Sequence, residues 1–186
     1  MKSTLALVAL GLLALVVQGA LARAVSPPWC PDLAWLVVVG LGLRWPGFLS
    51  GFVLAAFLGF AMDVVSGSLL GQHVLLRLLT YLAAALASRQ LDLSGGIPVA
   101  FLTFALSVAY GFGIVATRSI FAGVVGEGFG VEVVALAVAQ GFINMLCAGP
   151  IVAAVERIVS RFADEELSRR GGLALGYSAF PGRGRV

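Results

Sequence analysis

Apolar residues occur in this chain as long runs rather than at every second position. Runs of about 18 residues or more are long enough to cross the hydrocarbon core of a bilayer as a helix. The period-two alternation of a membrane β-barrel is absent from the sequence. Because a chain in lipid must satisfy its own backbone hydrogen bonds, the runs predict α-helices.

Glycine, proline and polar residues divide this pattern into six predicted helices. We expect them at about residues 4–22, 32–43, 48–65, 69–87, 97–121 and 131–159. The second is short for a bilayer core of about 30 Å, because a helix rises about 1.5 Å per residue. It is therefore expected to be tilted or to begin within the preceding "SPPWCP" turn. The fold class predicted is all-α, a polytopic bundle of six transmembrane helices.

Composition agrees with a membrane protein and narrows the chemistry. Of the 186 residues, 60% are hydrophobic and 11% charged, and the mean hydropathy is +1.05. The two cysteines, Cys30 and Cys147, form no CxxC pair, and His73 is the single histidine. Because metal sites need several such ligands at coordinating spacing, we expect no metal and no cofactor. Both thiols are expected to be free.

Lysine and arginine are distributed unequally between the two sides of the predicted bundle. With the amino terminus in the cytoplasm, nine lie inside: Lys2, Arg44, Arg89, Arg157, Arg161, Arg169, Arg170, Arg183 and Arg185. Two lie outside, Arg23 and Arg118, and Arg77 lies within the membrane. This positive-inside bias predicts a multi-pass protein with both termini in the cytoplasm.

The first residues also resemble a secretory signal peptide. They combine Lys2, an apolar stretch and an Ala-Leu-Ala site at residues 20–22. The apolar stretch continues through Leu21, beyond the roughly 7–15 residues of a signal-peptide core. We therefore expect a retained helix, while cleavage would still leave the carboxyl-terminal tail inside.

After Val159 the chain changes character. Glu165 and Arg169, like Glu166 and Arg170, stand four residues apart, which favours continuation of the last helix into the cytoplasm. The glycine-rich "GGLALGYSAFPGRGRV" that follows is typical of a flexible end. We divide the chain into a transmembrane domain, 1–160, and a helical extension with a flexible basic tail, 161–186. This tail either rests on anionic membrane lipids or stays solvated.

The stretch "GFAMDVVSGSLLGQHVLLR", residues 59–77, contains three ionisable groups, Asp63, His73 and Arg77. With a turn near Gly67, Asp63 lies level with His73, and the long side chain of Arg77 can reach back to the carboxylate. An unpaired charge near the bilayer centre costs about 2.5–3.5 kcal/mol, so pairing is expected. We predict a structural polar cluster of these three residues that fastens the hairpin near the outer leaflet. A proton path or a ligand contact would use the same groups.

Two further features predict how the helices pack. Gln140 and Asn144 lie one helical turn apart and are expected to form interhelical hydrogen bonds. The chain holds 24 glycines, many within the predicted spans, which favours close approach of helix backbones.

Three segments carry a resemblance to a known family. They are "PDL" at 31–33, "RWPGFLSGFVLAAFLGFAMDVVSGSLLGQHVL" at 44–75 and "YLAAALASRQLDL" at 81–93. The hairpin motif within them consists of Gly59, Asp63, Ser66, Gly67 and Gly71. In this order the segments resemble MreD, the family of rod shape-determining membrane proteins. The resemblance covers about residues 31–93.

This resemblance implies a non-enzymatic scaffold of the bacterial elongation machinery in the inner membrane. Its partners would be MreC and, through MreC, the RodA glycosyltransferase, a penicillin-binding transpeptidase and MreB filaments, with no nucleic acid. Peptidoglycan synthesis would thereby be directed along the side wall. The family is similar in architecture to the S-components, the six-helix substrate-binding subunits of vitamin transporters, so a transporter subunit is the alternative.

A third interpretation is an intramembrane hydrolase that uses Ser66, His73 and Asp63. The three residues lie within one hairpin, and no oxyanion donors are evident, so no catalytic residue is predicted.

Overall fold

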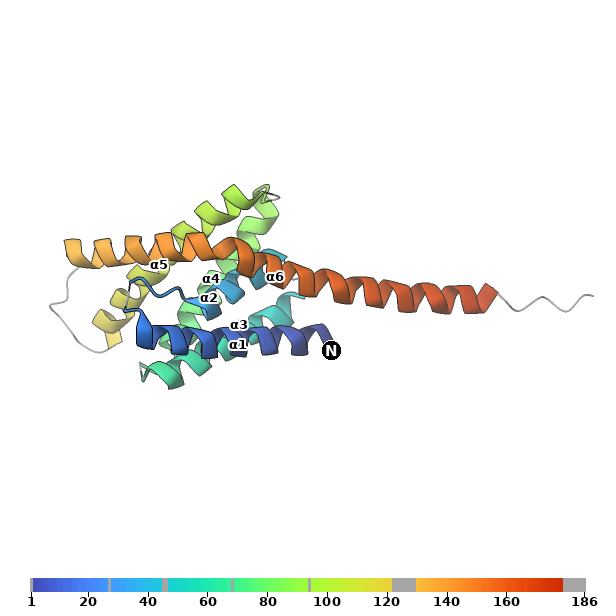
Figure 1. Ribbon diagram of the computed structural model, residues 1–186, viewed down its shortest axis with the longest axis horizontal. Helices are drawn as coiled ribbons and strands as arrows, with labels where there is room; N and C mark the ends of the chain where they lie inside the picture. Colours follow the sequence, from blue (N-terminus) through green and yellow to red (C-terminus); the bar gives the residue numbers. More distant parts are fainter. Residues whose placement is uncertain are drawn as a thin grey trace, which may run out of the picture.

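The computed structural model describes residues 2–178, apart from residues 27, 45–46, 68, 94 and 122–129, and not the side chains of residues 2 and 162–178. Within this part the protein consists of helices only, arranged as one bundle with a long extension (Figure 1). The helices are α1 Lys2–Ala24, α2 Leu33–Arg44, α3 Phe48–Ser66, α4 Gln72–Gln90, α5 Gly96–Phe121 and α6 Val131–Ser178. The predicted all-α class is confirmed.

The helix bounds agree with the predicted ones to within three residues, with one exception. Helix α4 begins at Gln72, slightly later than predicted, because Gly67 and Gly71 turn the chain with φ of 62° and 92°. Positive φ is a conformation that glycine adopts at little cost. The exception is α6, which continues as helix to Ser178 through part of the segment predicted to be flexible. The predicted ion pairs of that extension lie outside the side chains that the structure describes.

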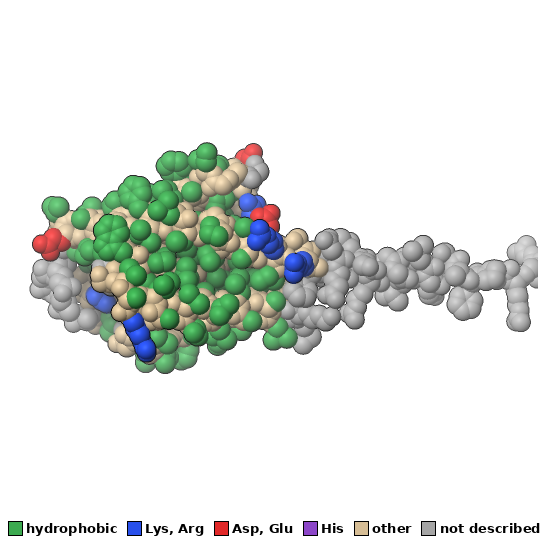
Figure 2. Space-filling model, in the orientation of Figure 1, with side chains coloured by type: hydrophobic (Ala, Val, Ile, Leu, Met, Phe, Trp, Pro, Cys, Tyr) green, Lys and Arg blue, Asp and Glu red, His purple; other side chains and the backbone are tan. Residues whose placement is uncertain are grey.

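Four helical segments of the described chain are long and apolar enough to cross a membrane. They are Ser3–Ala24, Phe48–Ser66, Gly96–Phe121 and Val131–Arg161. Hydrophobic side chains cover the face of the bundle that Figure 2 shows, and the charged side chains on it lie near its two ends. Such continuous apolar surface on a folded chain is expected when lipid surrounds it.

Helix α2 forms the core of the bundle. Each residue from Ala34 to Leu43 is buried, and the helix packs against α1, α3, α4 and α6. A helix that is hydrophobic all round buries every face. Its 12 residues measure only about 18 Å, which is shorter than a bilayer core of about 30 Å. It begins at Leu33, after the "SPPWCP" segment and not within it, and it is buried from Ala34 to Leu43.

The connections between helices fall at two ends of the bundle (Figure 1). One end holds the carboxyl-terminal ends of α1, α3 and α5 and the amino-terminal ends of α4 and α6, and we call it the hairpin end (Figure 1). The amino terminus and the extension of α6 lie at the opposite end, which we call the tail end (Figure 1).

Glycines allow two of the helix contacts to be very close, as predicted. A Cβ atom on Gly59 of α3 would lie 2.6 Å from the Cα of Val74 and 2.9 Å from the carbonyl oxygen of His73 in α4. A Cβ on Gly42 of α2 would lie 2.6 Å from the Cβ of Ala84. Small residues of this kind let backbones meet where side-chain burial adds little driving force.

Candidate functional site

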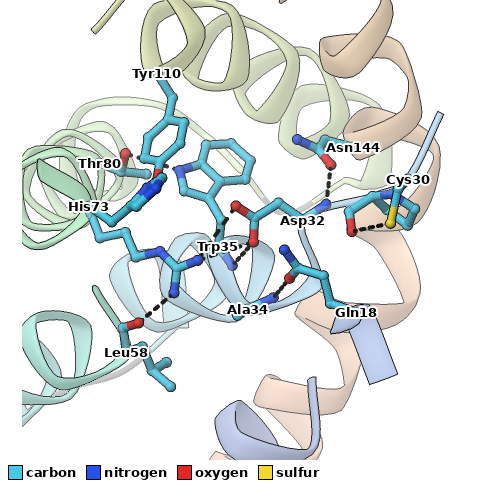
Figure 3. Close-up of polar contacts among 12 residues, drawn as sticks. Gln18, Cys30, Asp32, Ala34, Trp35, Leu58, His73, Thr80, Tyr110 and Asn144 are labelled. Carbon is cyan, nitrogen blue, oxygen red and sulfur yellow. Dashed lines mark hydrogen bonds and ion pairs between the residues drawn. The ribbon is translucent and has the colours of Figure 1, made fainter. Parts of the chain in front are cut away.

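The buried start of α2 is the centre of a polar network (Figure 3). The first N–H groups of a helix have no partner within it. Here Asp32 caps the helix, because its Oδ1 accepts a hydrogen bond from the backbone N–H of Trp35 at 2.9 Å. The Oε1 of Gln18 in α1 accepts from the N–H of Ala34 at 3.2 Å, and the Oδ1 of Asn144 in α6 accepts from the N–H of Asp32 at 3.0 Å. Side chains from α1 and α6 therefore hold the end of α2 in place.

Arg77 of α4 pairs with the carboxylate of Asp32. Its NH2 lies 3.2 Å from Oδ1 and 3.5 Å from Oδ2, and its NH1 donates to the carbonyl oxygen of Leu58 at 2.9 Å. The Arg77 side chain is 0% exposed and that of Asp32 is 16% exposed. The prediction gave Arg77 the partner Asp63, whereas the ion pair that the structure shows for Arg77 is with Asp32. It considered only the hairpin of α3 and α4, whereas burial of α2 brings Asp32 to Arg77 from 45 residues away.

Asp63 has a different structural role, as a cap for α4. Its Oδ2 accepts from the N–H of Gly71 at 2.9 Å, and its Oδ1 accepts from the N–H of His73 at 2.8 Å. The residue is 1% exposed. A carboxylate at a helix amino terminus is stabilised by the helix dipole and by these hydrogen bonds. Asp63 therefore lies level with His73, as predicted, and fastens the hairpin through backbone groups.

The ring of His73 contacts Tyr110 instead of a carboxylate. Its Nδ1 lies 2.6 Å from the Tyr110 hydroxyl, and the two rings stack with centroids 6.1 Å apart. Tyr110 also packs against Trp35, whose Nε1 donates to the Oγ1 of Thr80 at 3.2 Å. These contacts join α2, α4 and α5 through aromatic side chains.

The remaining residues of the hairpin motif are structural in the same way. Ser66 is the last residue of α3, Gly67 and Gly71 provide the left-handed turn, and Gly59 allows the close helix contact described above. The carboxylate of Asp63 accepts from the backbone N–H of His73, and the imidazole of His73 contacts the hydroxyl of Tyr110.

Asn144 forms the interhelical hydrogen bond predicted for it, whereas Gln140 bonds to the connection between α1 and α2. The Nε2 of Gln140 donates to the carbonyl oxygen of Cys30 at 2.8 Å, and the Nδ2 of Asn144 donates to the Oγ of Ser107 at 2.8 Å. Sequence reasoning missed Asp32, Gln18, Trp35 and Tyr110 as members of the same network. The sequence signal that could have revealed them was Asp32, a carboxylate directly before a short helix that has no polar face.

A cavity of about 610 Å³ lies beside this network at the hairpin end. Every helix contributes to its wall, through Gln18, Trp35, Met62, His73, Tyr110 and Asn144 among others. Its volume falls within the range of about 300–1,000 Å³ that is typical of small-molecule sites. Figure 3 shows Trp35, His73 and Tyr110 converging on one side of Asp32, with Gln18 and Asn144 on the other.

Cys30 lies in the connection between α1 and α2, at the edge of this cavity. Both cysteines are free thiols, as predicted. Burial raises the pKa of the Cys30 thiol, and the negative charge of Asp32 raises it further.

Comparison with family models, with curated proteins and with solved structures found no match to this chain. The resemblance to MreD therefore rests only on the three sequence segments described above. Asp32 of the "PDL" segment and Asp63 of the hairpin motif cap the starts of α2 and α4.

Proposed function

We propose that the chain is a non-enzymatic scaffold of the MreD type in the bacterial inner membrane. It binds MreC and, through MreC, is linked to RodA, a penicillin-binding transpeptidase and MreB. The observation that supports this best is that the residues carrying the resemblance also hold the bundle together. Asp32 of "PDL" pairs with Arg77, and Asp63 caps α4 beside Gly71.

The buried polar groups are used in hydrogen bonds between parts of the bundle, which fits a rigid scaffold better than a reaction centre. The carboxylates of Asp32 and Asp63 accept hydrogen bonds from helix starts, and the amides of Gln140 and Asn144 join separate segments. A scaffold also needs surface that a membrane partner can contact. Large apolar side chains are exposed along α1, α3 and α5, for example Val16, Val53 and Phe101.

In this proposal all six helices take part in crossing the membrane, and the tail end faces the cytoplasm. Among the described residues, Arg44, Arg89, Arg157 and Arg161 lie at the tail end, against Arg23 and Arg118 at the hairpin end. Positive charge near helix ends favours the cytoplasmic side. The amino terminus and the extension of α6 lie at that end too (Figure 1).

Co-purification tests the scaffold function. The full chain, carrying an affinity tag, is extracted from its native host in a mild detergent, and the recovered proteins are identified by mass spectrometry. We expect MreC in the eluate, and we expect its absence when another tagged multi-pass membrane protein replaces this chain. Failure to recover MreC with the wild-type chain would refute the proposal.

A second candidate function is the substrate-binding subunit of a small-molecule transporter. The cavity of about 610 Å³ favours it, because all six helices line it and its wall combines aromatic side chains with hydrogen-bonding groups. In that case the same purification would recover an ATP-hydrolysing module, and the chain would support ligand uptake in cells.

A further inference from the structure

The wall of the cavity holds hydrogen-bonding atoms that the helix contacts do not use. Gln18 accepts from the N–H of Ala34 through Oε1, and its Nε2 donates to no acceptor in the described part of the chain. Gln140 donates through Nε2, and its Oε1 accepts from no group that the structure describes. Both side chains line the cavity. A donor and an acceptor are therefore available to a bound molecule.

The charges at the cavity favour an anion. Asp32 lines the wall, but its carboxylate is paired with Arg77 directly behind it. Arg118, near the end of α5, also lines the cavity, is exposed, and pairs with no acidic side chain among the described residues. Among the described residues that line the cavity, the charge left without an ion-pair partner is therefore positive.

Aromatic rings supply a wall for a planar group. Trp35 and Tyr110 both line the cavity, with ring centroids 5.7 Å apart and ring planes inclined by 56°. Their hydrogen bonds to Thr80 and His73 fix the two side chains. A fixed aromatic wall is a favourable packing surface for a flat ring, because neither side chain has to be ordered on binding.

From these three observations we propose that the cavity binds a small molecule with one planar ring and one carboxylate group. The ring lies against Trp35 and Tyr110, the anion lies at Arg118, and Gln18 and Gln140 bind polar atoms of the ring. This inference deepens the second candidate function and rests on the cavity that supports it. It holds equally for a scaffold that carries a ligand.

Calorimetric titration of the purified full chain in detergent tests the proposal. The probes are benzoate, nicotinate and indole-3-acetate, each carried to millimolar concentration. Nicotinamide and indole-3-acetamide serve as neutral planar controls, and cyclohexanecarboxylate as an anion without a planar ring. We expect at least one planar carboxylate to bind saturably at one site, and at least tenfold more tightly than its neutral or non-planar control.

Three variants locate the binding. Arg118→Gln is expected to weaken binding of the planar carboxylate by about tenfold, the loss typical of one charge-assisted hydrogen bond. Arg23→Gln removes an exposed arginine at the same end of the bundle that does not line the cavity, and is expected to leave affinity unchanged. Ala22→Trp places a large ring at the exposed edge of the cavity and is expected to abolish binding.

The proposal fails if no planar carboxylate binds, or if Arg118→Gln and Arg23→Gln have equal effects. It also fails if only anionic lipid binds, which titration with phosphatidylglycerol against phosphatidylcholine vesicles would detect. Each of these outcomes would refute ligand binding without affecting the recovery of MreC that tests the scaffold function. Binding without ligand uptake in cells would support the inference and refute the transporter function.

Discussion

Asp32 and Arg77 form an ion pair inside the bundle, with Oδ1 and NH2 3.2 Å apart and the arginine side chain fully buried. The same Oδ1 caps α2 at the N–H of Trp35. One carboxylate thus neutralises a buried charge and completes a buried helix start. Because α2 packs against α1, α3, α4 and α6, this single residue influences the placement of most of the bundle.

Asp32→Ala is expected to destabilise the protein by about 3–5 kcal/mol, because Arg77 would remain buried without its partner. The measurements are accumulation in membranes and the midpoint of unfolding in detergent. Glu156→Ala is the matched control, since Glu156 pairs with Arg44 at 3.6 Å but is 57% exposed. Exposed pairs contribute little, so the control should accumulate as the wild type does. An Asp32→Ala protein that accumulates and unfolds normally would contradict the role of this pair.

The choice of partner for Arg77 is testable by a double-mutant comparison. Replacing Arg77 by Met removes the buried charge, so Arg77→Met should recover much of the stability lost in Asp32→Ala. In the Asp63→Ala background, Arg77→Met should not recover stability but should lower it further. Unfolding midpoints of the single and double variants decide between the two carboxylates. If Arg77→Met stabilises Asp63→Ala and not Asp32→Ala, the partner of Arg77 is Asp63, as expected from the hairpin alone.

Asp63→Ala is expected to cost about 0.5–2 kcal/mol through loss of the cap on α4, with a further cost because the N–H groups of Gly71 and His73 are left without an acceptor. Asp63→Asn retains one side-chain oxygen and should fall between the wild type and Asp63→Ala. Amide hydrogen exchange at residues 71–74 provides a local measurement. Equal protection in all three proteins would show that the carboxylate does not hold this helix start.

Gly59→Ala is expected to destabilise the contact of α3 with α4 by about 1–3 kcal/mol, the range for overpacking. The added Cβ would lie 2.6 Å from the Cα of Val74, and a backbone atom cannot move aside as a flexible side chain can. Gly19→Ala in α1 is the control, because its Cβ would have no neighbour within 4 Å. Thermal unfolding in detergent compares the two. Equal midpoints would contradict the close approach of the helices.

The thiol of Cys30 is expected to react slowly with maleimide near neutral pH. Its pKa is raised, so at a given pH it holds less of the reactive thiolate than a free cysteine does. The rate of maleimide labelling of Cys30 should therefore increase at a higher pH than the rate of labelling of glutathione does. Asp32→Asn removes one cause of the raised pKa and should shift the rate profile toward lower pH. Mass spectrometry of a Cys147→Ser protein follows the labelling of Cys30 alone.

Much of the fold follows from local pattern, and therefore from the sequence alone. Apolar runs marked the six helices, and Gly67 and Gly71 marked the turn, because helix formation and positive φ depend on neighbouring residues. The sequence also predicted that Asp63 lies level with His73, because a tight turn fixes which residues of the two helices are opposite each other. Gln140 and Asn144 were recognisable because polar amides in an apolar helix need partners from another part of the chain.

Tertiary structure alone decided which carboxylate meets Arg77, that α2 is the core, and that six helices enclose a cavity. Asp32 stands 45 residues from Arg77, and no spacing rule connects them. An ion pair forms between the groups that packing buries together, and a cavity is the space that packing leaves. Both depend on how α2 sits among its neighbours, which no single stretch of the chain encodes.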